Sequence, residues 1–139
     1  MKKMLFLLLT YIALVPSSFA DIYVVAHKEA QIEHLSKDEV TALFLGKKRT
    51  LPNGELAFMI DRGLDSTTRS EFFYLLNKMS LPRVNAYWSR LTFSGRMIPP
   101  TVIEQEAEML VLLSEKTNAI SYTNQKPTDS EVSIILSLK

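Results

Sequence analysis

Cysteine is absent from this chain of 139 residues, and its absence excludes several kinds of chemistry. Without cysteine there is no disulfide framework, no thiol nucleophile, no zinc–thiolate site and no residue to carry a lipoprotein anchor. Histidine is scarce: only His27 and His34 occur, and neither belongs to a His-Glu-x-x-His pattern that binds zinc. Nucleophilic catalysis also lacks a base placed near a serine in a recognisable arrangement. We therefore expect no enzyme, no metal site and no cofactor.

An excess of charge of one sign is missing as well. The chain has 16 basic and 15 acidic residues, and fourteen basic residues remain once Lys2 and Lys3 are set aside. Proteins that bind the phosphate backbone of nucleic acids need a basic surplus or a basic face. The composition therefore predicts that the protein has no nucleic-acid partner.

Long hydrophobic runs are limited to one near the N-terminus, residues 4–15, which is too short to span a bilayer comfortably. Lys2 and Lys3 precede this run, and the small residues Ser18 and Ala20 follow it. The order of basic, apolar and small residues is typical of a secretory signal peptide that is cleaved after the last small residue. The alternative is an uncleaved N-terminal anchor.

The predicted signal peptide covers residues 1–20 and leaves residues 21–139 as a single domain. A chain of this length can bury roughly two thirds of its unfolded surface in one modest core. A signal peptide without a cysteine for lipid attachment indicates a soluble protein of the periplasm. We therefore expect one periplasmic domain.

Strand and helix patterns alternate along this domain. Runs rich in β-branched and aromatic residues predict strands at residues 21–26, 56–60, 119–123 and 131–138. Apolar residues on one side of a 3.6-residue period predict helices that include residues 36–46, 72–79, 84–91 and 103–111. This alternation predicts the α/β class, with at least one crossover connection between strands.

Capping boxes mark three of the expected helix starts. In this motif a serine or threonine is followed three residues later by glutamate, and the two side chains bond each other's backbone N–H groups. The chain has this spacing at Ser36 and Glu39, at Thr68 and Glu71, and at Thr101 and Glu104. We expect the last helix to turn one face inward, formed by Ile103, Ala107, Leu110 and Val111.

The stretch DRGLDSTTRSEFF, residues 61–73, raises the main functional question. It follows a predicted strand and precedes a predicted helix, and open α/β sheets bind ligands beyond the carboxyl ends of their strands. A helix N-terminus offers free N–H groups and about half a positive charge, which suits an anion. The position of this stretch therefore makes it a candidate anion site.

Two interpretations of this stretch stay open. In the first, it binds a small oxyanion through polar donors, which are Arg62, Ser66, Thr67 and Thr68, with Arg69 as a second positive charge. In the second, it only caps a helix, since a capping box needs no ligand and Asp65 or Glu71 could neutralise the arginines. Local physics alone favours the cap.

Other candidate sites have a simpler structural explanation. The basic run at residues 47–49 could bind an anionic partner, but a solvated loop after a helix is the simpler reading. Asp61 and Asp65 could act as paired carboxylates, although aspartate is common in turns and caps. Tyr87 and Trp88 could stack on a ligand, whereas their helical spacing favours core packing.

The segment HLSKDEVTALFLGKKRTLPNGE, residues 34–55, resembles a motif of phosphate-type periplasmic substrate-binding proteins, in which Phe-Leu-Gly-Lys follows a helix. NAISYT resembles the Gly-Ala-Ile-Gly-Tyr-Val strand of those proteins. AYWSRLTFSGRMIPP is similar to a short, single-domain branch of the family. The resemblance extends over nearly all of residues 22–123.

This resemblance implies a single lobe of a type 2 periplasmic-binding-protein-like fold, with a central mixed sheet flanked by helices. In the full-length family two lobes close on phosphate, and an arginine and a hydroxyl-rich loop at a helix start contact the ion. The matching positions here are Arg62, Ser66, Thr67 and Thr68. Asp65 and Thr67 stand where the family loop has glycines, and Ser121 replaces a glycine of the late strand. These departures disfavour tight capture of phosphate.

The resemblance implies a periplasmic solute-binding module for phosphate or a related small oxyanion, associated with ABC-type phosphate uptake. The alternative is an interaction or regulatory module without a tight ligand. Such a module would dock on an inner-membrane ABC transporter or sensor protein, with residues 47–49 as a candidate contact. The oligomeric state is left open, a dimer included.

Overall fold

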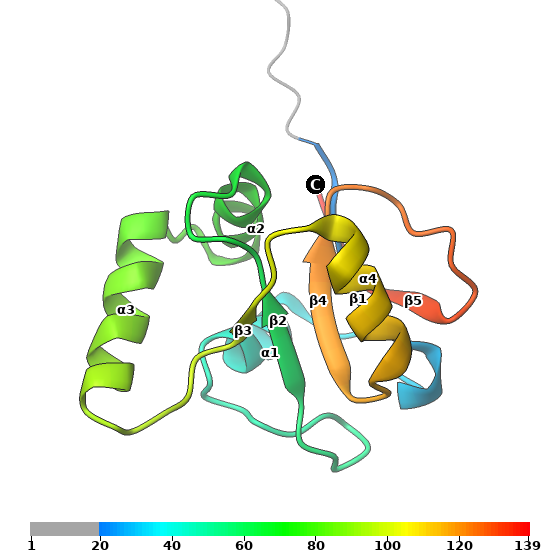
Figure 1. Cartoon of the computed structure of the whole chain (residues 1–139), viewed down its shortest axis with the longest axis horizontal. Coiled ribbons are helices and arrows are strands. Elements are labelled where there is room, and N and C mark those ends of the chain that lie inside the picture. The colour runs from blue at the N-terminus through cyan, green and yellow to red at the C-terminus, as the bar shows by residue number, and fades with distance from the viewer. Residues whose placement is uncertain (1–19) are drawn as a thin grey trace, which may run out of the picture.

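A five-stranded mixed sheet forms the centre of the molecule, in a computed structural model that describes residues 20–139. The strands lie in the order β3-β2-β4-β1-β5 (Figure 1). Their bounds are β1 Ile22–His27, β2 Phe58–Asp61, β3 Thr101–Val102, β4 Ala119–Thr123 and β5 Val132–Leu138. The predicted signal peptide, apart from Ala20, lies outside the described residues.

The strand directions bring three carboxyl ends to one edge of this sheet. β2 runs parallel to β3 and β4, with Ile60 opposite Thr101 and Phe58 opposite Ala119. β1 is antiparallel to both β4 and β5. The expected α/β class, with a central mixed sheet flanked by helices, is confirmed.

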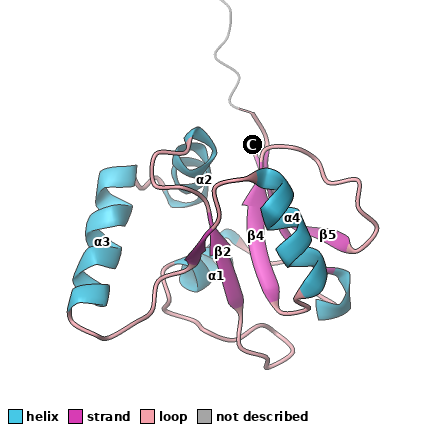
Figure 2. Cartoon of the chain, in the orientation of Figure 1, coloured by secondary structure: helices cyan, strands magenta, loops and turns pink. Residues whose placement is uncertain are grey.

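Helices cover both faces of the sheet. Their bounds are α1 Lys37–Phe44, α2 Thr67–Asn77, α3 Leu81–Phe93 and α4 Glu106–Glu115, with a 3-10 turn, η1, at Lys28–Ala30. In Figures 1 and 2, α4 lies in front of the sheet, α1 and α2 lie behind it, and α3 stands to one side. Within residues 20–139, no helix combines the length and apolar character needed to cross a membrane.

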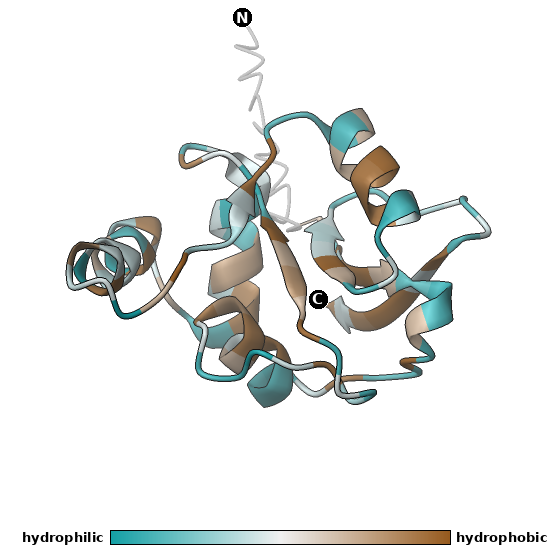
Figure 3. Cartoon of the chain, turned by 60° about the horizontal axis from the view of Figure 1, so that its bottom comes forward, coloured by the Kyte–Doolittle hydropathy of each residue, from teal (hydrophilic) through white to brown (hydrophobic). Residues whose placement is uncertain are grey.

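Two hydrophobic clusters pack on the two faces. Val24 and Ala26 of β1 join the larger cluster with α1 and α2, whereas Val25 points to the opposite face, where it meets Met109 and Leu113 of α4. This division follows from the two-residue repeat of a strand. Figure 3 shows hydrophobic colouring along the strands and mostly hydrophilic colouring on the loops.

The first predicted capping box is confirmed at the start of α1. The N–H of Glu39 donates to Ser36 Oγ at 3.1 Å, and the N–H of Ser36 donates to Glu39 Oε2 at 2.8 Å. The bond from the Ser36 backbone is the main reason that the pKa of the Glu39 carboxyl lies below its usual value. Pro82 stands in the first turn of α3, where a missing N–H has no cost.

The predicted capping box at Thr101 and Glu104 is wrong. Thr101 belongs to β3, where it pairs with Ile60 of β2, and α4 begins only at Glu106. Gln105 occupies the N-cap position without a side-chain cap bond. The sheet satisfies the backbone of this segment in an extended form, and this tertiary pairing overrides the local capping signal.

The later start of α4 also changes its inward face. Met109 and Leu113 are the fully buried residues of this helix, and Leu110 is half-buried. Val111, which was expected to point inward, is 56% exposed. Residues one turn apart on a helix share a face, so Met109 and Leu113 define the stripe that packs on the sheet.

Candidate functional site

Three strand ends and two helix starts meet at one edge of the sheet. β2 ends at Asp61, β3 at Val102 and β4 at Thr123, and the helices begin at Thr67 (α2) and Glu106 (α4). Because α2 follows β2 and α4 follows β3, both helices begin near this edge (Figure 1). Open α/β sheets place ligands at such an edge. We call this region the strand-end site.

A buried network centres on the carboxylate of Asp61. Its Oδ2 accepts a hydrogen bond from Arg69 Nε at 3.0 Å, and its Oδ1 accepts one from the Tyr122 hydroxyl at 2.5 Å. The backbone N–H of Arg62 also donates to Oδ1, at 2.8 Å. Arg69 Nη1 donates to Asn85 Oδ1 at 2.7 Å, which ties α2 to α3. The expectation that Arg69 supplies a second positive charge to a ligand is therefore wrong, because its charge is already neutralised.

Tyr122 joins this network to the hydrophobic core. Its ring stacks on Phe72 of α2, with the ring centroids 3.7 Å apart and the planes 7° from parallel. Burial, and then the nearby Asp61 carboxylate, raise the pKa of the Tyr122 hydroxyl well above its usual value. The hydroxyl therefore stays protonated and donates to Asp61, which holds β2 and β4 together at their ends.

Arg62 is paired, but with neither of the acidic residues that the sequence suggested. Its Nη1 donates to Glu106 Oε2 at 2.6 Å, and the other oxygen of Glu106 accepts a hydrogen bond from the Thr123 hydroxyl. The side chain of Arg62 is 8% exposed and that of Glu106 is 28% exposed. Arg62 Nε is buried and has no hydrogen-bond partner among residues 20–139. Glu106 therefore satisfies this guanidinium only in part.

Ser66 caps α2, so the capping box predicted at Thr68 and Glu71 is wrong. Ser66 Oγ accepts a hydrogen bond from the N–H of Arg69 at 3.3 Å, and the helix begins at Thr67. Thr68 therefore already lies in the first turn and cannot serve as the N-cap. The Ser66 hydroxyl acts as an acceptor in this cap, and its own proton can still be donated to a ligand.

Thr67 and Thr68 supply the other donors at the start of α2. Thr67 is exposed and Thr68 is half-buried, and neither hydroxyl has a hydrogen-bond partner within the described part of the chain. Their N–H groups precede the first intrahelical bonds, as at any helix start. Asp65 is exposed beside them and forms no ion pair within residues 20–139. These donors are open to solvent.

The side-chain charges of the strand-end site leave an excess of negative charge. Arg62 is balanced by Glu106, and the side chain of Glu104 lies against Gly63, where an added Cβ would be 3.3 Å from Glu104 Cγ. Asp65 adds a further negative charge. The attraction for an anion therefore comes mainly from the two helix N-termini, and from the Arg62 guanidinium once its ion pair with Glu106 is broken.

The remaining candidates from the sequence have structural roles or lie apart. Trp88 is 7% exposed and packs in the core, as its helical spacing predicted. Residues 47–49 form an exposed loop after α1. His27 ends β1, and its Nδ1 accepts a hydrogen bond from the N–H of Glu29. Among residues 20–139, no three histidine or carboxylate side chains cluster closely enough to hold a metal.

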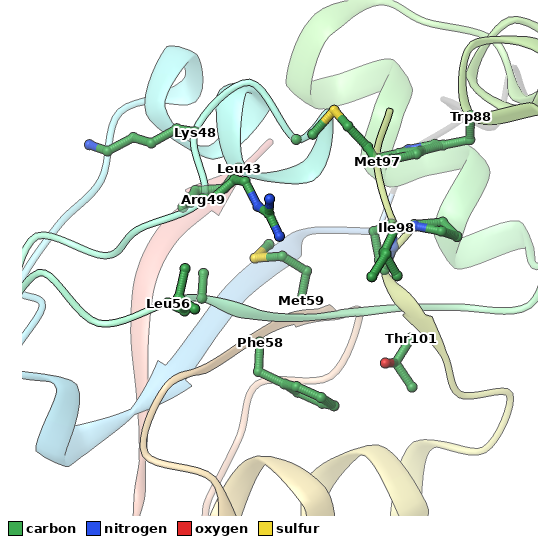
Figure 4. A pocket seen from close by; sticks show the side chains of 14 residues that line it. Leu43, Lys48, Arg49, Leu56, Phe58, Met59, Trp88, Met97, Ile98 and Thr101 are labelled. Atoms are coloured by element: carbon green, nitrogen blue, oxygen red, sulfur yellow. The ribbon is translucent and has the colours of Figure 1, made fainter. Parts of the chain in front are cut away.

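Two hollows lie on the side of the sheet near β2, β3 and α3. A cleft of about 750 Å³ opens between α3 and β3, with the Asp61 and Arg69 pair on its wall and Phe93 at its rim. A groove of about 250 Å³ lies beside residues 56–59 (Figure 4). Neither is lined by the predicted ligand-binding residues, which are Arg62, Ser66, Thr67 and Thr68.

The fold is similar to one part of several solved substrate-binding proteins. Three solved structures share it. The first, from Clostridium perfringens, is assigned as a phosphate ABC transporter substrate-binding protein with bound phosphate, and it matches with a TM-score of 0.65 at 17% identity. An ABC-type phosphate transport receptor from Vibrio cholerae matches with a TM-score of 0.61 at 15% identity, and PstS from Borrelia burgdorferi with 0.57 at 14%.

The matches cover most of this chain but less than half of the solved chains. They cover 84%, 84% and 76% of this chain, but only 45%, 46% and 41% of the solved chains. This chain therefore spans less than half the length of the proteins it resembles. No protein-family model and no curated protein matches the sequence. At identities this low, the likeness shows the shared fold.

Sequence reasoning found Arg62 but missed the groups around it. Tyr122 and Thr123 end a correctly predicted strand, and polar residues at the ends of parallel neighbours meet at one edge. That signal was present, but it could not be used without the strand order. Glu106 carried no signal, because a glutamate in the first turn of a helix is common for electrostatic reasons.

Proposed function

We propose that this chain is a periplasmic solute-binding module that holds phosphate or another small oxyanion at the strand-end site. One observation carries the proposal: Arg62 is almost fully buried at the ends of parallel strands, and its Nε has no partner among the described residues. An oxyanion offers acceptors to two N–H groups of a guanidinium at once. Ser66, Thr67 and Thr68 supply further donors at the start of α2. No covalent step is involved, so the protein is a binding protein rather than an enzyme.

Glu106 competes with the ligand in this proposal. Its carboxylate has the charge and the oxygen acceptors of a small oxyanion, and it already occupies Nη1 of Arg62. The Glu106 side chain is 28% exposed, so it can turn toward solvent when an anion enters. Binding must first break this ion pair, and the affinity for phosphate is therefore weak in the wild-type protein.

The ligand class and the setting rest on the shared fold. One of the similar structures contains phosphate, and another is described as a phosphate transport receptor. We infer the same ligand class here, together with a role in ABC-type phosphate uptake at the inner membrane. The predicted signal peptide would direct the protein to the periplasm. The chain matches less than half of those structures, so the strand-end site corresponds to only one part of their ligand shell.

Isothermal titration calorimetry with phosphate and sulfate tests the proposal. We expect millimolar binding to the wild-type protein and no binding to Arg62→Gln. Glu106→Gln removes the competing charge but keeps a similar shape, and we expect it to bind phosphate about tenfold more tightly. Arg90→Gln is the matched control, since Arg90 is an exposed cation on α3 away from the site.

Two outcomes would contradict the oxyanion proposal. One is the absence of heat with either anion in both the wild-type protein and Glu106→Gln. The other is equal binding by Arg62→Gln and Arg90→Gln, which would show that general surface charge, and not the buried guanidinium, attracts the anion. Circular dichroism spectra of each variant establish that the comparison is made between folded proteins.

A second candidate function is a protein-interaction or regulatory module, favoured by the apolar surface near α3. Phe93 is 97% exposed, and Leu64 and Val102 are more than 45% exposed around the same cleft. Ile98, which is 84% exposed, lines the neighbouring groove. Exposed apolar side chains grouped in this way mark interaction sites. Capture of a partner from an envelope extract tests this function. Phe93→Ser should abolish capture, whereas Val111→Ser, a control at an exposed position on α4, should keep it. Capture that does not change when phosphate or sulfate is added would favour this function.

A further inference from the structure

The groove beside β2 is separate from the strand-end site and has a different chemistry. It lies between the loop of residues 46–49, residues 56–59 and the segment of residues 97–101, with Trp88 contributed by α3 (Figure 4). Its volume is about 250 Å³. None of the residues proposed to hold the oxyanion lines it. A ligand in this groove would therefore bind independently of phosphate.

The walls of the groove are mainly apolar and adaptable. The apolar side chains among its walls include Leu43, Met59, Trp88 and Met97. Methionine side chains are unbranched and polarisable, so they adjust to irregular shapes, and aromatic rings add flat contact surfaces. Such walls suit the apolar body of a small organic molecule better than a fully hydrated inorganic ion.

A single unpaired guanidinium reaches over these walls. In Figure 4 the Arg49 side chain extends across the groove toward Met59, whereas the Lys48 side chain points away. Arg49 forms no ion pair within residues 20–139, and no acidic residue lines the groove. Arg96 joins Arg49 in the adjoining hollow, which also lacks an acidic residue. The groove therefore favours a negatively charged group next to an apolar surface.

Close packing at Gly46 gives the groove a firm wall. Gly46 has φ +69°, and an added Cβ there would lie 2.1 Å from Met97 Cε and 3.0 Å from Trp88 Cη2. The two side chains therefore rest directly on the bare backbone of this glycine. Trp88 is only 7% exposed, so its position is set by the core.

We propose that this groove binds a small organic carboxylate, with the carboxylate on Arg49 and the apolar body against Met59, Met97 and Trp88. Carboxylates match the paired N–H groups of a guanidinium. Pockets for drug-sized ligands start at roughly 300 Å³, and this groove is smaller, so its ligand has one ring or a short alkyl chain. The apolar walls distinguish this ligand from the phosphate of the strand-end site.

The fluorescence of Trp88 gives a direct assay, because the chain contains one tryptophan. The probe is 3-phenylpropionate, and the matched neutral compound is 3-phenylpropan-1-ol. We expect a saturable change in emission with the carboxylate and about tenfold weaker binding, or less, with the alcohol. Arg49→Met keeps an unbranched apolar stem and should weaken carboxylate binding about tenfold. Lys47→Met, which removes a neighbouring charge outside the groove, should change it less than about twofold.

Several results would overturn the proposal. They are no saturable change by fluorescence or calorimetry, equal binding of the acid and the alcohol, or equal effects of Arg49→Met and Lys47→Met. Loss of 3-phenylpropionate binding in Arg62→Gln would also overturn it, because the carboxylate would then occupy the strand-end site. Retained binding in Arg62→Gln, even if that protein binds no phosphate, supports a separate groove.

Discussion

The substitution Asp61→Asn probes the buried network most directly. Asp61 accepts three hydrogen bonds on two oxygens, from Arg69, Tyr122 and the backbone of Arg62. Asparagine has nearly the same shape, but it has one acceptor oxygen and a donor NH₂ group. If the amide oxygen keeps the bond from Tyr122, the amide nitrogen faces Arg69 Nε, donor against donor. If the amide flips, its nitrogen faces the N–H of Arg62 instead.

The expected cost follows from the burial of the ion pair. The side chains of Asp61 and Arg69 are 4% and 3% exposed, so Asp61→Asn leaves a guanidinium charge inside the protein without its counter-ion. Removing one partner of a buried pair costs about 3–5 kcal/mol. We expect a loss of about 3 kcal/mol, at the lower end, because Asn85 still accepts from Arg69 and the Phe73 ring stays 5.4 Å from its Cζ.

Urea unfolding followed by circular dichroism measures this loss, and an unchanged m-value shows that only stability has changed. The double variant Asp61→Asn with Arg69→Met removes both charges. It should cost about 2 kcal/mol less than the sum of the two single variants, since no buried charge is left unpaired. Lys28→Met is the control: it breaks the exposed Lys28–Glu131 pair and should leave the free energy of unfolding nearly unchanged.

The reasoning is refuted if Asp61→Asn costs less than about 0.5 kcal/mol, which is the usual range of surface substitutions. It is also refuted if the single costs add fully in the double variant, because charges that interact directly cannot give additive effects. A large loss of stability from Lys28→Met would show that the exposed and the buried ion pairs do not differ in their contribution to the free energy of unfolding.

Two further predictions concern pH and backbone geometry. Burial raises the pKa of the Tyr122 hydroxyl in the folded protein, so this group stabilises the fold fully below its unfolded pKa near 10, and the stabilisation is lost as pH rises toward the higher folded pKa. Tyr122→Phe should therefore lower the free energy of unfolding at pH 7, but its free energy of unfolding should fall less steeply above pH 10 than that of the wild type. If urea unfolding shows the two proteins losing stability equally steeply above pH 10, the prediction is contradicted. Gly46→Ala and Gly54→Ala both place alanine at positive φ, but only the first meets Met97. Gly46→Ala should therefore lower the melting temperature more, and equal shifts would disprove the close packing at this wall.

Local patterns predicted much of the fold because they depend on neighbours in the sequence. The strand at residues 119–123 was predicted with the bounds that the structure has, and the box of Ser36 and Glu39 forms as expected. The strand expected at residues 56–60 is instead β2, Phe58–Asp61, because Leu56 pairs with Thr50 in an isolated bridge. Such shifts arise where a distant segment offers the backbone an alternative partner.

The predicted ligand-binding residues all lie at the strand-end site, and their contact with a ligand stays a prediction. The position of Arg62 after a strand was sufficient to select it, since strand ends in α/β sheets are common ligand sites. Its partner could not be selected, because Asp65 and Glu71 are near in the sequence whereas Glu106 is near only in the folded chain. The prediction that Ser66, Thr67 and Thr68 contact a ligand stays a prediction.

The sequence by itself determined the α/β class, the absence of thiol chemistry and the helix that follows Ser36, because composition, periodicity and capping are local properties. Tertiary structure alone decided that Arg69 and Tyr122 donate hydrogen bonds to the Asp61 carboxylate, and that Arg62 pairs with Glu106. These pairings depend on which strands are parallel and on where α4 begins. An ion pair is selected by distance in the folded chain, and that distance does not follow from spacing along the sequence.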